Sequence, residues 1–442
     1  MTAAHETLKT KFDDRTAVIG VIGLGYVGLP LVRAFHNVGY PVVGFDVDPS
    51  KIQALEVGQA YLKHLGDELM TTLAQSERFE ATADFSRLNE VDAVLICVPT
   101  PLGLHREPDL SFVEKTAETI AQHGRPGQLI VLESTTYPGT TRDIMLPKLE
   151  AVGRVAEHDV FVGYSPERED PGRANASTRT IPKLVGGTGP HSSALCVQLY
   201  RAAIDEVVPV SSAEVAESAK LLENIYRAVN IALVNEMKVV LGALDIDVWE
   251  VIEAASTKPF GFQPFYPGPG LGGHCIPIDP FYLTWKAREI GLPTRFIELA
   301  GEVNHQMPGY VVDRTVLALN DDERAVKGAN VLVLGLAYKP DVDDIRESPS
   351  LEIIDGLLAL GAHVDYHDPH LPKMPKTRRS RPALVSIDLS EATLASYDAV
   401  IIATHHAAYD WSLIKAHAKL VVDCRGVMRH VEEVQGARVV SA

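Results

Sequence analysis

The stretch Gly23-Leu-Gly25-Tyr-Val-Gly28 decides the fold, because it follows an apolar run over 17–22 and opens a helical pattern. Three glycines at this spacing permit a tight turn, a close backbone approach to a pyrophosphate and close packing of helix on strand. The helix N-terminus then offers N–H groups to phosphates. The spacing alone could indicate only a tight turn, so the prediction depends on what surrounds it.

The next predicted strand, 41–45, is followed directly by Asp46. In a dinucleotide site, a carboxylate at this point accepts hydrogen bonds from the adenosine ribose and repels a 2′-phosphate. The order strand, glycines, helix, strand and Asp therefore predicts a dinucleotide site that takes NAD rather than NADP. Lys51 could complement the ribose or a phosphate.

The first third of the chain alternates short apolar runs with segments long enough for crossover helices. This alternation predicts parallel strands in a doubly wound sheet, and hence an α/β fold. The pattern recurs beyond residue 305, which predicts a second α/β domain that keeps only Gly335 of the glycine triplet and so holds no second dinucleotide. The predicted strands are 17–22, 41–45, 93–98, 129–132, 160–163, 207–210, 331–334, 363–366, 399–403 and 420–422.

Between the two domains, residues 214–243 contain no proline and carry apolar side chains on nearly every face. A helix that is apolar all round is buried, either in a core or in a subunit interface. We therefore predict a long central helix that joins the two domains and contributes to a homodimer or a higher homo-oligomer.

Composition excludes several classes of protein. The net charge of −17 argues against nucleic-acid binding, which requires a basic surface. No apolar run is long enough to span a bilayer, and residues 1–15 lack the apolar core of a signal peptide, so we expect a frayed lead-in there. The four cysteines are scattered without a CxxC pair, which is typical of a protein in a reducing cytoplasm.

Cys275 lies in the segment Gly268-Pro-Gly-Leu-Gly-Gly-His-Cys-Ile-Pro-Ile-Asp279, whose glycines allow close approach of a ligand. An isolated Cys is usually a small buried hydrophobe. The glycines before Cys275 and Pro277 after it argue against a core helix or strand, so we expect the thiol to be displayed. No Cys or His lies at ligand spacing, so no metal is expected.

Lys220 and Asn224 are four residues apart and therefore share one face of the predicted central helix. They could form an exposed polar stripe. However, a Lys and an amide side by side could also stabilise an oxyanion, and Asp279 could orient or activate water. Spacing does not place any of the three beside Cys275.

These residues resemble the nucleotide-sugar 6-dehydrogenase family, which oxidises UDP-glucose and UDP-N-acetylhexosamines. The matching blocks run in family order from about 21 to 350, and the strands beyond them resemble the family's UDP-binding domain. The blocks are Gly23-Leu-Gly-Tyr-Val-Gly-Leu-Pro, Cys97-Val-Pro-Thr-Pro, Ser165-Pro-Glu, Ala219-Lys-Leu-Leu-Glu-Asn, Gly272-Gly-His-Cys-Ile-Pro-Ile-Asp, Gly335-Leu-Ala-Tyr-Lys-Pro-Asp and Arg346-Glu-Ser.

The resemblance implies two Rossmann-like domains joined by a long central helix. It implies an NAD-binding domain over 1–211, a helical dimerisation region with the Cys loop over 212–305, and a UDP-sugar-binding domain over 306–442. It also implies oxidation of the sugar C6 alcohol to a carboxylate with two NAD⁺. Cys275 would form a thiohemiacetal and then a thioester, since a thiolate is both nucleophile and leaving group.

The resemblance also gives roles to individual positions. The implied catalytic residues are Cys275, Lys220 and Asn224 (oxyanion), Asp279 (water) and Glu167 (hydrolysis). The implied cofactor residues are Gly23, Gly25, Tyr26, Val27, Gly28, Asp46, Lys51, Pro99, Thr100, Thr135 and Arg346. The implied substrate residues are Glu167, Arg168, Lys220, Asn224, Lys258, Tyr266, Gly270, Gly272, Tyr338, Lys339 and Arg425.

Two departures separate this chain from the UDP-glucose branch of the family. That branch has Lys where this chain has Ile278, and a second acid where this chain has Pro171. The loop that starts at Tyr266 is most similar to the bacterial UDP-N-acetyl-D-glucosamine 6-dehydrogenases of O-antigen pathways. We therefore expect UDP-N-acetyl-D-glucosamine as substrate, with UDP-N-acetyl-D-mannosamine and then UDP-glucose as alternatives.

Two other classes remain open. A two-electron NAD oxidoreductase acting on a hydroxy acid would account for the first domain but leave Cys275 without a role. A non-catalytic nucleotide-sugar sensor would keep the fold and bind ligand without reducing NAD.

Overall fold

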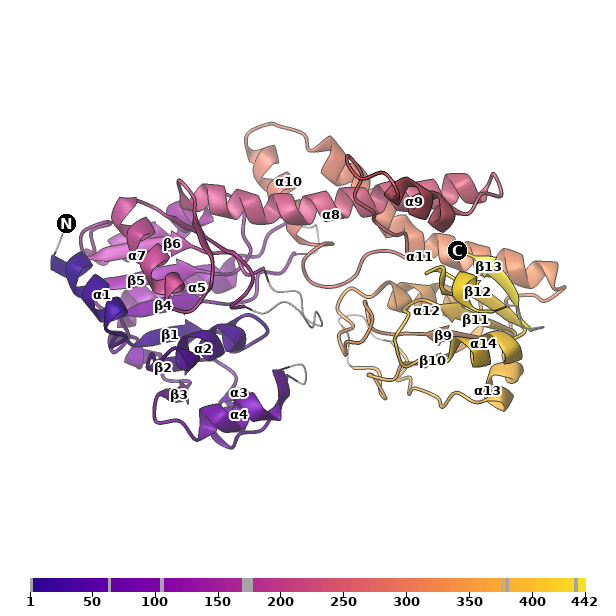
Figure 1. Cartoon of the computed structure of the whole chain (residues 1–442), viewed down its shortest axis with the longest axis horizontal. Helices are drawn as coiled ribbons and strands as arrows, with labels where there is room; N and C mark the ends of the chain where they lie inside the picture. The colour runs from indigo at the N-terminus through magenta and orange to yellow at the C-terminus, as the bar shows by residue number, and fades with distance from the viewer. Residues whose placement is uncertain are drawn as a thin grey trace. The chain divides into compact units, whose positions relative to one another are not determined.

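The computed structural model describes residues 3–62, 65–103, 107–168, 178–375, 377, 381–432 and 436–442. They form two compact units. We call Met1–Glu223 with Phe281–Leu292 the N-terminal unit, and Asn224–Pro280 with Pro293–Ala442 the C-terminal unit. Figure 1 shows that each unit is built around its own sheet.

The sheet of the N-terminal unit has the strand order β3-β2-β1-β4-β5-β6-β7-β8. Its neighbouring strands pair in parallel, apart from the antiparallel pair β6–β7. The strand order reverses between β1 and β4, and cofactors bind at the carboxyl ends of strands at such a point. The strands are β1 Ile19–Ile22, β2 Val42–Phe45, β3 Phe79–Thr82, β4 Ala93–Ile96, β5 Gln128–Leu132, β6 Val160–Tyr164, β7 Lys183–Gly187 and β8 Val207–Pro209.

Helices lie between most of these successive strands, as the crossover lengths predicted (Figure 1). The prediction of a frayed lead-in over 1–15 was wrong, because α1 occupies Ala3–Asp13 and packs on α7. His5, Leu8 and Phe12 lie on one face at helical spacing, and all three are buried. The other helices of the unit are α2 Gly28–Asn37, α3 Pro49–Glu56, α4 Gly66–Ala74, α5 Ser111–His123, α6 Leu146–Glu150 and α7 Pro190–Arg201.

The C-terminal unit contains a parallel sheet with the order β10-β9-β11-β12-β13. Successive residues of β9 enter opposite cores: Val331 and Val333 one, Leu332 and Leu334 the other. Helices therefore cover both faces of this sheet. Its elements are α11 Arg295–Asp321, β9 Asn330–Leu334, α12 Pro349–Ala359, β10 His363–His367, α13 Glu391–Ser396, β11 Ala399–Ile402, α14 Trp411–His417, β12 Leu420–Asp423 and β13 Arg438–Ser441.

The predicted central helix is α8, Ala213–Gly242, whose first turns belong to the N-terminal unit and whose remainder belongs to the C-terminal unit. It is followed by α9 (Val248–Ser256) and α10 (Asp279–Glu289). The α/β class, with two Rossmann-like sheets and a long helix shared by both units, is thus confirmed. None of the described helices combines the length and the apolarity needed to cross a membrane.

Candidate active site

The loop between β1 and α2 has the geometry that its glycines predicted. Gly23 has a φ of +93°, and a Cβ there would approach the Cys97 carbonyl oxygen to 2.5 Å. A Cβ on Gly28, the first residue of α2, would collide with the Gly23 carbonyl oxygen. A Cβ on Gly25 would meet nothing within 4 Å, so the space over this residue is open to a ligand.

Asp46 lies at the carboxyl end of β2 and is buried. One of its carboxylate oxygens accepts the Leu24 amide at 2.8 Å and the Lys51 ammonium at 2.8 Å. The other oxygen accepts the Asp48 amide at 3.0 Å. Lys51 therefore forms an ion pair with Asp46 in this structure.

Together, the open space over Gly25, the α2 N-terminus and the buried Asp46 fit a dinucleotide. The other predicted cofactor residues of this unit lie on neighbouring strand ends. Tyr26 and Val27 are half-buried before α2, Thr135 is half-buried after β5, and Pro99 is exposed after β4. The carbonyl of the buried Thr100 accepts the Tyr282 hydroxyl at 2.8 Å.

Two predicted catalytic residues meet in the N-terminal unit. The Lys220 side chain is buried, and its ammonium donates to the Glu167 carbonyl at 2.5 Å. Lys220 is therefore not part of an exposed stripe. The Glu167 carboxylate accepts the Arg168 amide at 2.7 Å and lies 3.5 Å from the Lys183 ammonium.

A buried ion pair supports this segment, although the sequence patterns did not identify it. The Lys183 ammonium donates to the Glu133 carboxylate at 2.6 Å and to the Pro166 carbonyl at 3.2 Å. Burial raises the pKa of Glu133 to about 7, while the charge of Lys183 opposes this shift; the Tyr200 hydroxyl donates to the same carboxylate. Burial lowers the pKa of Lys183, but the charges of Glu133 and Glu167 outweigh this effect and raise it. The pair fixes the backbone that carries Glu167.

Arg168, a predicted substrate residue, makes contacts within the same unit. Its guanidinium donates to the Pro182 carbonyl at 2.6 Å and to the Glu223 carboxylate at 2.7 Å. These bonds connect the segment after β6 to α8.

The C-terminal unit brings Cys275, Asp279 and Asn224 together. Cys275 is exposed, as predicted for a displayed thiol. Its carbonyl accepts the Asp279 amide at 2.8 Å where α10 begins. The buried Asp279 carboxylate in turn accepts a hydrogen bond from the buried Asn224 side-chain amide, and the Asn224 carbonyl oxygen accepts one from Arg227. The Asn224 amide and the Asp279 carboxylate thus orient each other, and Asp279 is hydrogen-bonded to the backbone of Cys275.

The glycine-rich loop before Cys275 is anchored at Gly268. The side chain of Asn235 in α8 accepts the Gly268 amide at 3.0 Å, and the Lys238 ammonium donates to the Gly268 carbonyl at 3.0 Å. Arg425, a predicted phosphate residue, reaches the same point: a Cβ on Gly268 would lie 2.6 Å from its guanidinium. Asn235 and Lys238 had not been predicted, because their spacing resembles that of any polar pair on a helix.

Further along this loop, the predicted substrate residues pack on one another. A Cβ on Gly270, where φ is +133°, would press on Pro308 and Pro349 at 3.3 Å. A Cβ on Gly273 would lie 2.8 Å from the Tyr338 ring, and a Cβ on Gly272 would overlap the Tyr338 side chain at 2.5 Å. The loop therefore needs glycine in order to lie against Tyr338.

Four other predicted residues belong to this unit. Lys258 and Tyr266 are exposed, with the Lys258 ammonium 5.0 Å from the Phe260 ring centroid. The Lys339 ammonium lies 5.8 Å from the Tyr338 ring. Arg346, predicted to contact NAD, forms an ion pair with Asp344 at 2.6 Å, and its carbonyl accepts the Gly273 amide at 2.8 Å.

The first unit thus carries a dinucleotide-binding turn, and the second carries an exposed cysteine on a glycine-rich loop. Family models match along the chain: the NAD binding domain of the UDP-glucose/GDP-mannose dehydrogenase family over residues 17–204, its central domain over 214–306 and its UDP binding domain over 332–430. The chain therefore belongs to the UDP-glucose/GDP-mannose dehydrogenase family, uses NAD as its cofactor and has a UDP-sugar as its substrate class.

Individual relatives are similar over most of their length. The chain is 37% identical over 353 residues to a UDP-N-acetyl-D-glucosamine 6-dehydrogenase from Pseudomonas aeruginosa, covering 79% of this chain and 82% of the relative. It is 33% identical over 434 residues to the Escherichia coli K12 UDP-N-acetyl-D-mannosamine dehydrogenase, covering 93% and 99%. A solved UDP-D-ManNAc dehydrogenase from Pyrococcus horikoshii superposes with a TM-score of 0.85 at 31% identity, covering 96% and 98%.

Proposed function

We propose that this protein oxidises the C6 hydroxyl of UDP-N-acetyl-D-glucosamine to the uronic acid in two steps through Cys275. The observation that carries the proposal is the exposed Cys275, on a glycine loop, next to the buried Asn224–Asp279 pair. An ordinary alcohol–ketone oxidoreductase has no use for such a thiol. The overall balance is one alcohol, two NAD⁺ and one water to one carboxylate, two NADH and three protons.

The residues take successive roles in this proposal. NAD⁺, when bound, accepts the hydride in each oxidation. The Cys275 thiolate adds to the C6 aldehyde to give a thiohemiacetal, which is oxidised to a thioester; water then attacks the thioester, and the thiolate leaves. Lys220 and Asn224 stabilise the developing oxyanions. Asp279 orients the water, and Glu167 assists the hydrolysis.

Replacement of Cys275 by alanine tests this chemistry. Loss of a covalent nucleophile lowers the rate of acid formation by at least about 10³-fold, by analogy with other nucleophile deletions. The measurement is NADH formed at 340 nm per UDP-sugar consumed, with the acid identified by mass spectrometry. Cys196→Ala, in the core of α7, is the matched control and should keep its activity.

Two stoichiometries in the unaltered protein would overturn the proposal. One NADH per sugar with a carbonyl product would indicate a two-electron oxidoreductase. Binding of UDP-sugars without any NADH would indicate a sensor.

The sugar is proposed from the loop starting at Tyr266 and from the names of the relatives, which include both the N-acetylglucosamine and the N-acetylmannosamine enzymes. The deciding assay compares kcat/KM for the UDP-linked sugars N-acetylglucosamine, N-acetylmannosamine, N-acetylgalactosamine and glucose. The highest value for N-acetylglucosamine supports the proposal, and a higher value for N-acetylmannosamine replaces it with the alternative.

We also infer a homodimer formed through α8. Several large apolar side chains of this helix remain exposed within the chain, among them Leu222 (66%), Leu233 (54%) and Val240 (49%). An apolar face of this kind is typical of a subunit interface. Leu222→Glu with Leu233→Glu should convert a dimer to a monomer in sedimentation, whereas Val385→Glu, at an exposed valine outside α8, should not. A monomeric unaltered chain would refute this inference.

A further inference from the structure

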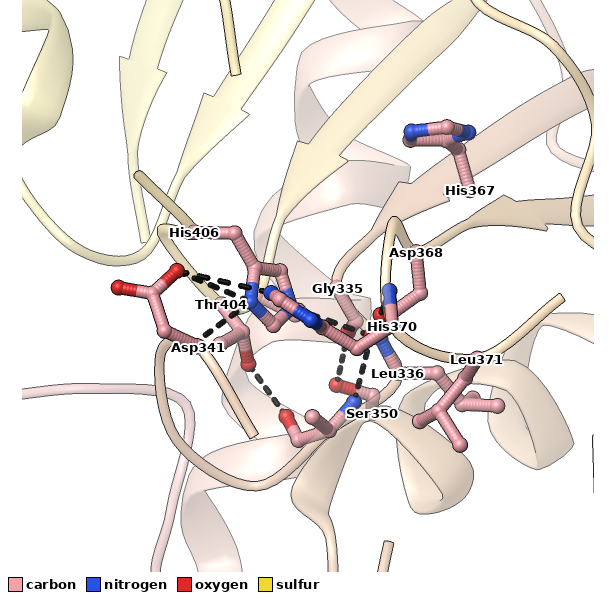
Figure 2. Close-up of polar contacts among 12 residues, drawn as sticks. Gly335, Leu336, Asp341, Ser350, His367, Asp368, His370, Leu371, Thr404 and His406 are labelled. Atoms are coloured by element: carbon pink, nitrogen blue, oxygen red, sulfur yellow. Dashed lines mark hydrogen bonds and ion pairs between the residues drawn. The ribbon is translucent and has the colours of Figure 1, made fainter. Parts of the chain in front are cut away.

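Three metal-ligating side chains meet in the C-terminal unit, outside the proposed catalytic residues. Asp341 follows β9, His370 follows β10, and His406 follows β11 (Figure 2). The Asp341 carboxylate oxygen lies 3.7 Å from His370 Nε2 and 3.8 Å from His406 Nδ1. One ligand atom from each residue lies within 4.8 Å of the other two.

The His406 ring is oriented as a metal ligand would be. It is fully buried, and its Nε2 lies 3.1 Å from the buried Asp368 carboxylate. Its Nδ1 accepts the Asp341 amide at 2.9 Å, so Nε2 must carry the proton and Nδ1 the lone pair. A histidine that donates one ring N–H to a carboxylate and offers the other nitrogen is a recurring arrangement at zinc sites.

His370 adds an independent observation. Its Nε2 atom is buried without a hydrogen-bond partner in the described part of the chain. The ring lies against that of His406, with 4.9 Å between their centroids, and Figure 2 shows both rings beside Asp341. A buried ring nitrogen that makes no hydrogen bond costs free energy, which a bound cation would recover.

We propose that Asp341, His370 and His406 bind one Zn²⁺, with water completing the coordination. Two imidazole nitrogens and one carboxylate oxygen form a donor set that suits this ion. Ligand atoms about 2.1 Å from Zn²⁺ stand about 3.4 Å apart in a tetrahedron. The two separations from the Asp341 oxygen, 3.7 and 3.8 Å, are close to this value, and the ligand atoms of the two histidines, within 4.8 Å of each other, would have to approach as the metal binds.

Zinc binding exchanges one existing contact and keeps another. The Nδ1 lone pair of His406 moves from the Asp341 amide to the metal, and the exposed Asp341 amide is released to water. The Asp341 carboxylate oxygen can still accept the Ala407 amide, now at 2.9 Å. The metal thus connects the segments that follow three adjacent strands. The spacing of these residues in the sequence is too wide and too varied to resemble a metal motif.

The test uses the full-length protein in a Cys275→Ser background, which removes the exposed thiol as a competing ligand. Chelator-treated protein is titrated with Co²⁺, whose visible absorption reports low-coordinate nitrogen and oxygen ligands, and Zn²⁺ is then added. We expect one Co²⁺ per chain, displaced by Zn²⁺, and a rise in melting temperature with Zn²⁺.

His370→Ala and Asp341→Asn should each weaken Co²⁺ binding at least about tenfold, the size of effect that removal of a metal-site partner produces. His363→Ala, at the opposite end of β10, should leave binding unchanged. Circular dichroism confirms that each variant is folded. No saturable binding in the background protein, or equal binding in His370→Ala and Asp341→Asn, would overturn the proposal. The test is independent of the proposed oxidation, since it does not measure turnover.

Discussion

The two Rossmann-like units begin alike and then diverge. Gly23 and Gly335 each follow a central strand directly, and both have a positive φ, +93° and +87°. A Cβ on Gly335 would lie 2.7 Å from the Thr404 carbonyl oxygen, much as one on Gly23 would meet Cys97. After that point, α2 begins at Gly28, whereas α12 begins only at Pro349. The glycine turn therefore allows close packing against the neighbouring strand end in both units. Only in the first unit does a helix begin shortly after the turn.

The acids that follow the second strand of each unit also differ. Asp46 accepts one amide of the glycine loop, that of Leu24. Asp368 accepts two loop amides, those of Leu336 and Ala337 at 2.7 and 2.9 Å, and pairs with His406. Asp368 thus binds one loop amide more than Asp46 does, that of Ala337. A glycine after the first strand and an acid after the second define a Rossmann turn. A cofactor site also needs loop amides that no protein group accepts.

The largest effect is expected for the two acids. Asp368→Ala leaves two buried amides and His406 without their acceptor and should cost about 3–5 kcal/mol of unfolding free energy. It should leave the KM for NAD unchanged. Asp46→Ala should raise that KM by about 10–100-fold, the value of a charged hydrogen bond, and should improve relative use of NADP. For both variants, urea unfolding measures the loss of stability, and the kinetics of NADH formation measure the KM for NAD. An unchanged NAD/NADP preference in Asp46→Ala would show that Asp46 does not select the cofactor.

The glycines provide a second pair of variants. Gly335→Ala places a methyl group in the left-handed region against Thr404 and should cost about 2–4 kcal/mol of stability. Gly25→Ala meets no neighbour, so its melting temperature should stay within a degree or two, whereas its KM for NAD should rise at least tenfold as the methyl occupies ligand space. If Gly25→Ala bound NAD normally, the open space over Gly25 would not be the cofactor site.

Two buried lysines, Lys183 in the first unit and Lys238 in the second, differ in what they bind. Lys183 pairs with Glu133, whereas Lys238 donates to the Gly268 carbonyl and takes part in no ion pair among the described residues. Burial therefore lowers the pKa of Lys238 from 10.5 to about 8. Burial of the Lys238 ammonium costs stability, and its hydrogen bond to Gly268 holds the loop that leads to Cys275.

This contrast predicts a pH effect on stability. Between pH 8 and 10.5, the unfolded chain binds the Lys238 proton and the folded chain does not, so this residue makes stability rise with pH, by about 3 kcal/mol over that window. In Lys238→Met that contribution should vanish. The measurement is the difference in urea unfolding free energy between the two proteins from pH 7.5 to 10.5. A constant difference would show that Lys238 titrates normally.

Local patterns were enough to predict most of the framework. Strands such as β1, β4 and β11 are continuous apolar runs, and α8 was predicted to within a residue at each end. Elements with mixed composition were missed: β3 is Phe-Glu-Ala-Thr at a sheet edge, β7 contains two glycines, and β13 starts with Arg438. Their strand state depends on a neighbour that supplies hydrogen bonds, which no local window contains.

The sequence by itself determined the glycine turn, the acid after β2, the displayed Cys275 and the family to which they belong, because each is encoded within a few adjacent residues. Only the tertiary structure decided that Lys220 is buried against Glu167, that Asn224 orients Asp279, and that Lys183 pairs with Glu133. It alone also brought Asp341, His370 and His406 together. These contacts join residues far apart in the chain, so their existence depends on how helices and strand ends pack in the folded protein.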